Sequence, residues 1–176
     1  MMKRKLKIFT QNLGHDIEDE DVADAYREES LPLVGTVVMY FNALEKSLDS
    51  LICDIVSDRT EEPGLIVLQG MHFAQKVDLF KRFCESFHRA VEEPLAYDRL
   101  VDGLLEVAKL RNLVVHADWM STDEEGFTFV RIKVQKDCLQ QEYVQLSADS
   151  LERVLERILA VNTQLSYYWE ERSEIR

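Results

Sequence analysis

The chain has 176 residues, of which 46% are apolar and 31% charged, and a net charge of −12, as expected of one soluble globular domain rather than a disordered chain. The negative charge argues against nucleic-acid binding through a broad basic face but leaves room for a local basic site. No stretch approaches the roughly 18 consecutive apolar residues of a membrane span, and no secretory signal is recognisable, so we expect a cytoplasmic protein with no membrane partner.

Two segments of opposite charge precede the first long apolar pattern. Residues 16–29 contain eight acidic side chains, and residues 3–7 contain four cations, namely Lys3, Arg4, Lys5 and Lys7. Runs of like charge near a terminus are usually hydrated. We therefore expect residues 1–30 to form a mobile basic arm followed by a solvated acidic helix or loop, outside a folded bundle of residues 31–176.

Four segments repeat apolar residues at spacings of three and four, which is the pattern of an amphipathic helix. Proline stands at or just before the start of three of them, where it costs least, and Ser147 supplies an N-cap for the fourth. These prolines are Pro32, Pro63 and Pro94, and the predicted helices are 31–57, 65–89, 94–116 and 148–171. The pattern predicts a mainly α fold, a bundle of four long helices.

The stretch before the last helix has a different period. In FTFVRIKV the alternation places Val130, Ile132 and Val134 on one side, and EYVQL follows after a polar connection. Gly126, with the acidic residues before it, indicates a turn. We predict a β-hairpin at about 118–146, inserted before the fourth helix.

Two charged residues interrupt the apolar faces of predicted helices. Arg111 lies near the middle of the apolar stripe of the third helix, and Glu45 lies inside that of the first. An unpaired buried charge is very costly, so one interpretation is that Glu45 pairs with Arg111 and holds it. The other is that each side chain lies at the rim of its stripe and reaches water along its own stem.

The motif RNLVVH, Arg111 to His116, resembles the signature of the HEPN family, small helical-bundle proteins of which many are RNases. In that family an arginine, usually followed by Asn, Asp or His, precedes a histidine by a gap of four to six residues near the end of a late helix. Asn112 holds the second position here, and Glu45 would match an acidic residue common in the family's early helix. The resemblance implies a metal-independent endoribonuclease without a cofactor.

The residue types suit that chemistry. Cleaving RNA without a metal requires a base for the 2′-hydroxyl proton, an acid for the leaving oxygen and positive charge at the phosphate. His116 is suited to acid–base work, the Arg111 fork binds phosphate oxygens, and Asn112 can hydrogen-bond the substrate or orient the histidine. On one helix Arg111 and His116 are about 140° apart. As in HEPN RNases, a two-fold homodimer would bring two copies of each into one cleft.

Other interpretations stay open. Family members often act as toxins or defence effectors, so an antitoxin or regulatory protein is an expected partner besides RNA. The alternative is a non-catalytic HEPN-like dimeric scaffold or regulatory subunit, in which Arg111 and Glu45 tie two helices together and His116 caps a helix end. A helical ligand-binding protein unrelated to the family is a third.

The remaining candidates are weaker. A second arginine–histidine match, Arg82 to His88, places its arginine on the solvent face. The three cysteines, Cys53, Cys84 and Cys138, show neither disulfide nor zinc spacing. No metal site is therefore predicted.

Overall fold

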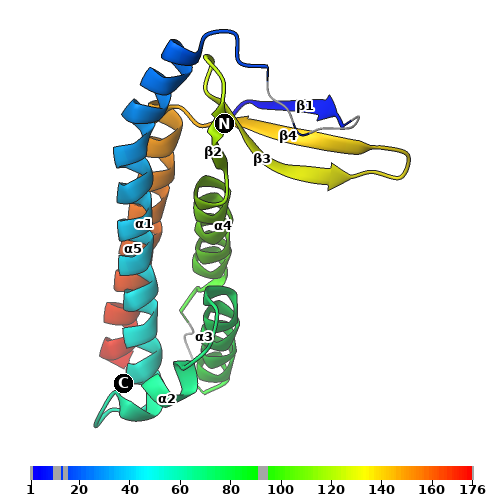
Figure 1. Ribbon diagram of the computed structural model, residues 1–176. Helices are drawn as coiled ribbons and strands as arrows, with labels where there is room; N and C mark the ends of the chain where they lie inside the picture. The colour runs from blue at the N-terminus through cyan, green and yellow to red at the C-terminus, as the bar shows by residue number, and fades with distance from the viewer. Residues whose placement is uncertain (1, 10–12, 14–15, 91–94, 176) are drawn as a thin grey trace. The chain divides into compact units, whose positions relative to one another are not determined.

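The computed structural model describes residues 2–9, 13, 16–90 and 95–175 (Figure 1). Within these residues the chain is mainly helical, with one small four-stranded antiparallel sheet. The helices are α1 (Glu20–Val56), α2 (Glu62–Leu68), α3 (Phe73–His88), α4 (Asp98–Val115) and α5 (Ala148–Ile175), and the strands are β1 (Arg4–Ile8), β2 (Asp118–Thr122), β3 (Phe127–Val134) and β4 (Leu139–Gln145). None of the described helices has the length and apolar character that a bilayer crossing requires.

The chain divides into two compact units. Unit 1 is Met1–Val38 with Leu110–Leu155, and unit 2 is Met39–Lys109 with Glu156–Arg176. Unit 1 therefore holds the sheet, the first part of α1, the last turn of α4 and the start of α5. The predicted boundary at residue 30 falls inside α1, which is continuous from Glu20 to Val56.

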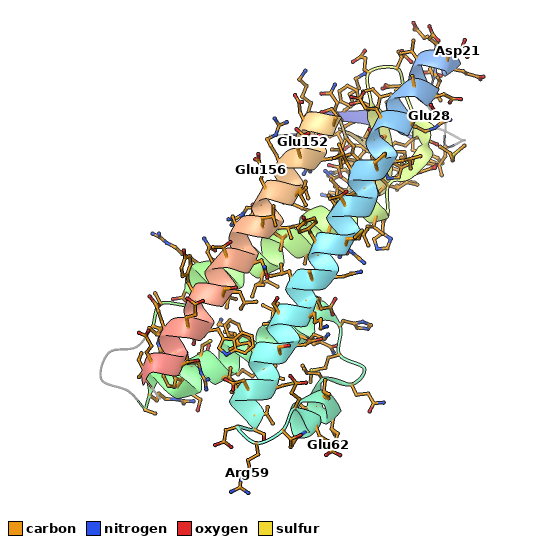
Figure 2. All side chains as sticks on the ribbon, turned by 90° about the vertical axis from the view of Figure 1, so that its left-hand side faces the viewer. Asp21, Glu28, Arg59, Glu62, Glu152 and Glu156 are labelled. Carbon is orange, nitrogen blue, oxygen red and sulfur yellow. The ribbon has the colours of Figure 1, made fainter. Side chains whose placement is uncertain are left out.

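The predicted start of the first helix, residue 31, is wrong because α1 already begins at Glu20. Pro32 lies inside the helix, where it removes one backbone hydrogen bond. The carbonyl that loses its partner belongs to Glu28, an exposed residue, so water can solvate it. The acidic segment is thus a solvated helix, as the charge run allowed, and Figure 2 shows Asp21 and Glu28 projecting from it.

The predicted second helix is wrong as a single element, because a turn divides it into α2 and α3. Gly70 adopts a φ of 78° in this turn, a left-handed conformation that suits glycine. Pro63 lies in the first turn of α2, as predicted. The fourth helix is confirmed: α5 begins at Ala148, and the backbone N–H of Ser150 donates to Ser147 Oγ at 3.3 Å. The third predicted start at Pro94 lies outside the described residues.

The predicted hairpin is confirmed as β3 and β4, but the sheet has two further strands in the order β1-β4-β3-β2. Residues 4–8 were expected to be a mobile arm; instead they form β1, which pairs with β4 along its whole length. Lysines suit such an edge strand because they discourage further pairing. Gly126 lies in the turn between β2 and β3.

The alternation predicted for β3 is also interrupted. A register shift between Phe129 and Arg131 leaves Val130 without a cross-strand partner, which is the pattern of a β-bulge. Val130 packs against the buried cluster around Val144, whereas Ile132 pairs with Gln141 on the opposite face. Placing Val130, Ile132 and Val134 on one side was therefore wrong.

Glu142 lies at the centre of the sheet, and its carboxylate is fully buried. Arg4 Nη1 and Lys133 Nζ each donate to its Oε1 at 2.9 Å, and Arg131 Nε donates to its Oε2 at 2.7 Å. Burial by itself raises the pKa of this carboxyl, but the hydrogen bonds from Lys133 and Arg131 lower the pKa by more, so that it lies below its usual value. The three cations thus keep Glu142 charged in the folded sheet.

A pH-dependent stability follows from the lowered pKa of Glu142. Its contribution is complete above the ordinary value of 4.5 and is lost as the pH falls through the folded pKa. We expect Glu142→Gln to lower the free energy of unfolding near neutral pH by about 1–3 kcal/mol. In urea titrations the difference in the free energy of unfolding between Glu142→Gln and wild type should become smaller at acidic pH. The exposed Glu125→Gln is the control, and a gap that is constant with pH would contradict the assignment.

In unit 2, a close approach of α2 to α1 depends on Gly64. A Cβ at this position would lie 2.5 Å from the Cα of Cys53, so an alanine has to push the two helices apart. We expect Gly64→Ala to lower the free energy of unfolding by roughly 1–3 kcal/mol. Gly35→Ala, on a helix surface with nothing within 4 Å, should instead raise it by about 0.5–1 kcal/mol. Equal effects in chemical denaturation would contradict this packing.

Candidate functional site

The predicted motif occupies the end of α4. Arg111 and Asn112 lie in its last turn, and His116 is the first residue after it. The predicted apolar stripe is confirmed, since Leu104 and Val107 are fully buried. Arg111 follows Val107 by one turn and is half-buried, so the stripe ends in a cation.

Asn112 contacts both partners of the motif. Its side-chain Oδ1 accepts a hydrogen bond from Arg111 Nη1 at 3.0 Å. Its backbone carbonyl accepts one from the backbone N–H of His116, also at 3.0 Å. The His116 residue is exposed. The site thus combines a half-buried guanidinium, oriented by a neighbouring amide, with an imidazole that solvent can reach.

The end of α4 is anchored to the sheet within unit 1. The indole Nε1 of Trp119 donates to the carbonyl of Val114 at 3.0 Å, satisfying one of the carbonyls that a helix end leaves open. Trp119 and Leu113 also pack against a buried cluster of Ala117, Val144 and Leu146. These contacts give Trp119 a packing role. The motif therefore lies on a well-fixed part of unit 1.

Glu45 lies in unit 2, and its observed partner there is Lys76 of α3. Lys76 Nζ donates to Glu45 Oε1 and to Asp49 Oδ2, each at 2.8 Å, and the Lys76 side chain is only 10% exposed. Burial lowers the pKa of Lys76, but the hydrogen bonds to Asp49 and Glu45 raise it by more, to above its usual value. Lys76 therefore provides the positive charge that makes Glu45 tolerable within the apolar stripe of α1. Pairing of Glu45 with Arg111 involves residues of different units and stays a prediction.

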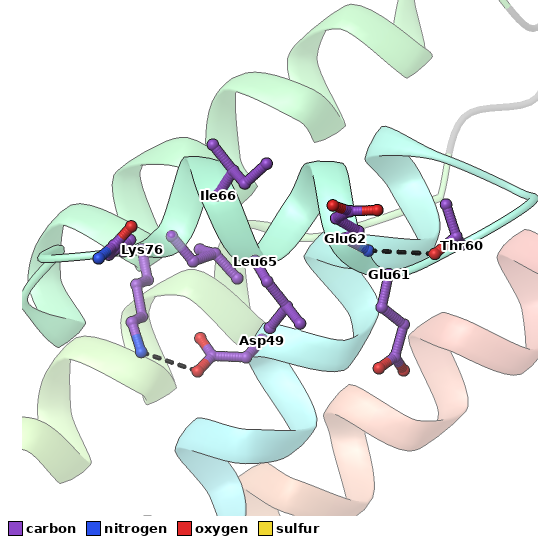
Figure 3. A pocket seen from close by; sticks show the side chains of 9 residues that line it. Asp49, Thr60, Glu61, Glu62, Leu65, Ile66 and Lys76 are labelled. Atoms are coloured by element: carbon purple, nitrogen blue, oxygen red, sulfur yellow. Dashed lines mark hydrogen bonds and ion pairs between the residues drawn. The ribbon is translucent and has the colours of Figure 1, made fainter.

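The same lysine borders a hollow of about 700 Å³ in unit 2 (Figure 3). Figure 3 shows Asp49 and Lys76 meeting at this hollow, with Leu65 and Ile66 from α2 beside them. None of the four predicted site residues is among those that line it; the lining residues are Asp49, Thr60, Glu61, Glu62, Leu65, Ile66, Leu68, Gln69 and Lys76. The hollow and the motif are therefore separate features.

The second arginine–histidine match is a structural feature. Arg82 is exposed and pairs with Asp78 on its own helix at 2.8 Å, as predicted. The ring Nε2 of His88 contacts the carbonyl of Leu95, and the ring packs edge-on against Tyr97 with centroids 4.7 Å apart. These contacts hold the end of α3, and the match serves as a natural control for the motif in α4.

Cysteine chemistry is disfavoured in the described residues. Cys53 and Cys84 are buried and Cys138 is half-buried. Burial raises the pKa of the Cys84 thiol to about 11, and its Sγ accepts a hydrogen bond from the Tyr168 hydroxyl at 3.1 Å. A thiol of this kind is protonated at neutral pH and is a poor nucleophile.

Two clusters of charged side chains were not predicted from the sequence. They are the cations around Glu142 and the Lys76 pair. The register of β1, β3 and β4 is what reveals the first, because Arg4 and Glu142 are 138 residues apart. Among the described residues, no group of three or more histidine, cysteine, aspartate or glutamate side chains could hold a metal ion.

Comparisons with protein-family models, curated proteins and solved structures find no match. The chemistry and placement of the chain's own residues are therefore the basis for its function. The HEPN resemblance stays a prediction carried by Arg111, Asn112 and His116.

The role of Lys76 can be tested by stability. Lys76→Met keeps the length of the stem but leaves Glu45 and Asp49 facing each other without a cation. We expect the free energy of unfolding to fall by about 1–3 kcal/mol, measured by chemical denaturation. Lys81→Met removes an exposed lysine whose pair with Glu85 spans 3.8 Å, and should cost less than about 0.5 kcal/mol. Similar losses in both variants would count against the pairing.

Proposed function

We propose that this protein is a metal-independent endoribonuclease of the HEPN type, with Arg111 and His116 as its catalytic residues. The observation that carries the proposal is an exposed imidazole, His116, placed directly after a helix end that also carries a half-buried arginine. An exposed imidazole is accessible to a substrate and can act as a general acid or base. Arginine is the side chain best suited to a phosphate beside it.

In the proposed reaction the ribose 2′-hydroxyl attacks the adjacent phosphorus. An imidazole takes the hydroxyl proton as the new P–O bond forms. The bond from phosphorus to the 5′ oxygen breaks, and a protonated imidazole supplies the proton to that leaving oxygen. Arg111 stabilises the charge that develops on the phosphate, and Asn112 orients Arg111 through its amide oxygen. The products are a 2′,3′-cyclic phosphate and a free 5′-hydroxyl, and no water is consumed.

One reaction needs both a base and an acid, whereas each motif provides one histidine. We propose a two-fold homodimer in which two copies of Arg111 and His116 share a cleft, one imidazole serving as base and the other as acid. A cytoplasmic toxin or defence effector, restrained by an antitoxin or regulatory protein, is the setting that such an activity suits.

The test is cleavage of labelled single-stranded RNA and transfer RNA in the presence of EDTA. We expect His116→Ala and Arg111→Ala each to lower the cleavage rate at least about 100-fold, which is the usual loss for an acid–base group or a charge-stabilising group. Mass spectrometry of the wild-type products should show the cyclic phosphate end. Sedimentation of the wild type should show a dimer.

Arg82→Ala and His88→Ala are the matched controls. Both should cleave at the wild-type rate per folded molecule, with folding checked by circular dichroism because His88 makes packing contacts. Equal activity in all variants would identify a contaminating nuclease and reject the site. A dimer that cuts no RNA, and in which Arg111→Ala only lowers stability, would instead identify the non-catalytic scaffold.

A further inference from the structure

The cations around Glu142 outnumber the negative charge that they contact. Arg4, Arg131 and Lys133 contact the single carboxylate of Glu142, so three positive charges meet one negative charge and two remain in excess. We call these three residues the sheet cation cluster. The strand register places them all on one face, because Leu6, two residues from Arg4, and Arg131 both pair directly with Glu142.

The sheet cation cluster is accessible from solvent. The side chains of Arg4 and Arg131 are 51% and 56% exposed, whereas that of Glu142 is 0% exposed. The carboxylate therefore lies beneath the guanidinium groups. Each guanidinium carries five N–H donors, so the bond to Glu142 leaves donors for a second, outer acceptor.

The opposite face of the sheet has no such excess. Lys5 and Lys7 lie there, at alternate positions of β1, and both have acidic partners. Lys5 Nζ lies 3.2 Å from Glu125 Oε2, and Lys7 Nζ lies 3.1 Å from Asp16 Oδ2. Positive charge without matching acid is thus confined, among the described strands, to the face of Glu142.

That face is also the one on which the end of α4 packs. Val144 is two residues from Glu142 along β4, roughly 7 Å, and its side chain is on the same face. Val144 belongs to the buried cluster that Leu113 and Trp119 contact. The sheet cation cluster and the RNLVVH motif therefore share one unit and one side of the sheet.

We propose that the sheet cation cluster binds the phosphate backbone of the RNA strand that enters the RNLVVH site. The inference rests on the proposed function for the identity of the anion. Guanidinium groups match phosphate oxygens in pairs, and a protein of net charge −12 needs a local positive surface to hold a polyanion. RNA is favoured over an acidic polypeptide as the ligand because the sheet cation cluster and the RNLVVH motif lie on the same side of the sheet.

The experiment measures binding of fluorescein-labelled oligouridine by anisotropy, in the His116→Ala background so that the RNA stays intact. We expect Arg4→Gln combined with Arg131→Gln to weaken binding at least about tenfold. Two lost phosphate contacts should also reduce the slope of log K against log salt by about 1.4. Lys7→Gln, on the same strand but the opposite face, should stay within about twofold of the parent.

Several outcomes would overturn the inference: no binding by the parent, equal weakening by Lys7→Gln, or tighter binding of polyglutamate than of RNA. If the double variant fails to fold, Arg4→Gln alone, which leaves two cations on Glu142, must weaken binding more than Lys7→Gln does. Wild-type protein that binds RNA through these residues but never cuts it would reject the proposed function and keep this inference. Cleavage by wild type with unchanged binding by the variants would reject this inference alone.

Discussion

The carboxylate of Glu142 has no access to water, and the arrangement of unit 1 depends on how its charge is satisfied. An ionised carboxylate is stable in such a position only when several donors replace its hydration. Here β1 and β3 provide these donors from both sides of β4. The same requirement fixes the register, because a shift by one residue would turn Glu142 to the other face and separate it from Arg4 and Arg131.

Unit 2 satisfies the same physical requirement with the signs reversed. Lys76 is the buried charge, and α1 provides two carboxylates for it. Charged groups in both units therefore specify which elements lie together, while the apolar residues around them provide most of the burial energy. The end of α4 takes part in unit 1 through Trp119, whose indole both satisfies a helix carbonyl and packs against the sheet. Arg111 and His116 thus stand on a well-supported scaffold.

The structural features that could be predicted from the sequence are those that depend on local periodicity. The stripe of α4, the N-cap at Ser147 and the pairing of β3 with β4 all depend on residues close in the chain. Residues 4–8 were misjudged because an edge strand rich in lysine looks like a hydrated tail until its partner is known. Two helix boundaries were predicted wrongly. Pro32 indicated a helix start, but a proline is tolerated on an exposed side of a helix. Gly70 lies inside one predicted helix, but a single left-handed glycine suffices to divide it. In the candidate site, the motif of Arg111, Asn112 and His116 could be recognised from the sequence. The partner of Glu45 could not, because it lies on α3 and is known only once α3 is placed against α1.

The pairing of β1 with β4 has a consequence for the way the chain folds. The strand β1 is synthesised before its partner β4, which follows more than a hundred residues later, since Arg4 and Glu142 are separated by 138 positions. Contacts of such long range close late, because the entropy of the intervening chain opposes them. The part of unit 2 from Met39 to Lys109, which is encoded in between, has time to form its helices first. We therefore expect the pairing of β1 with β4 to be the last step in the assembly of unit 1.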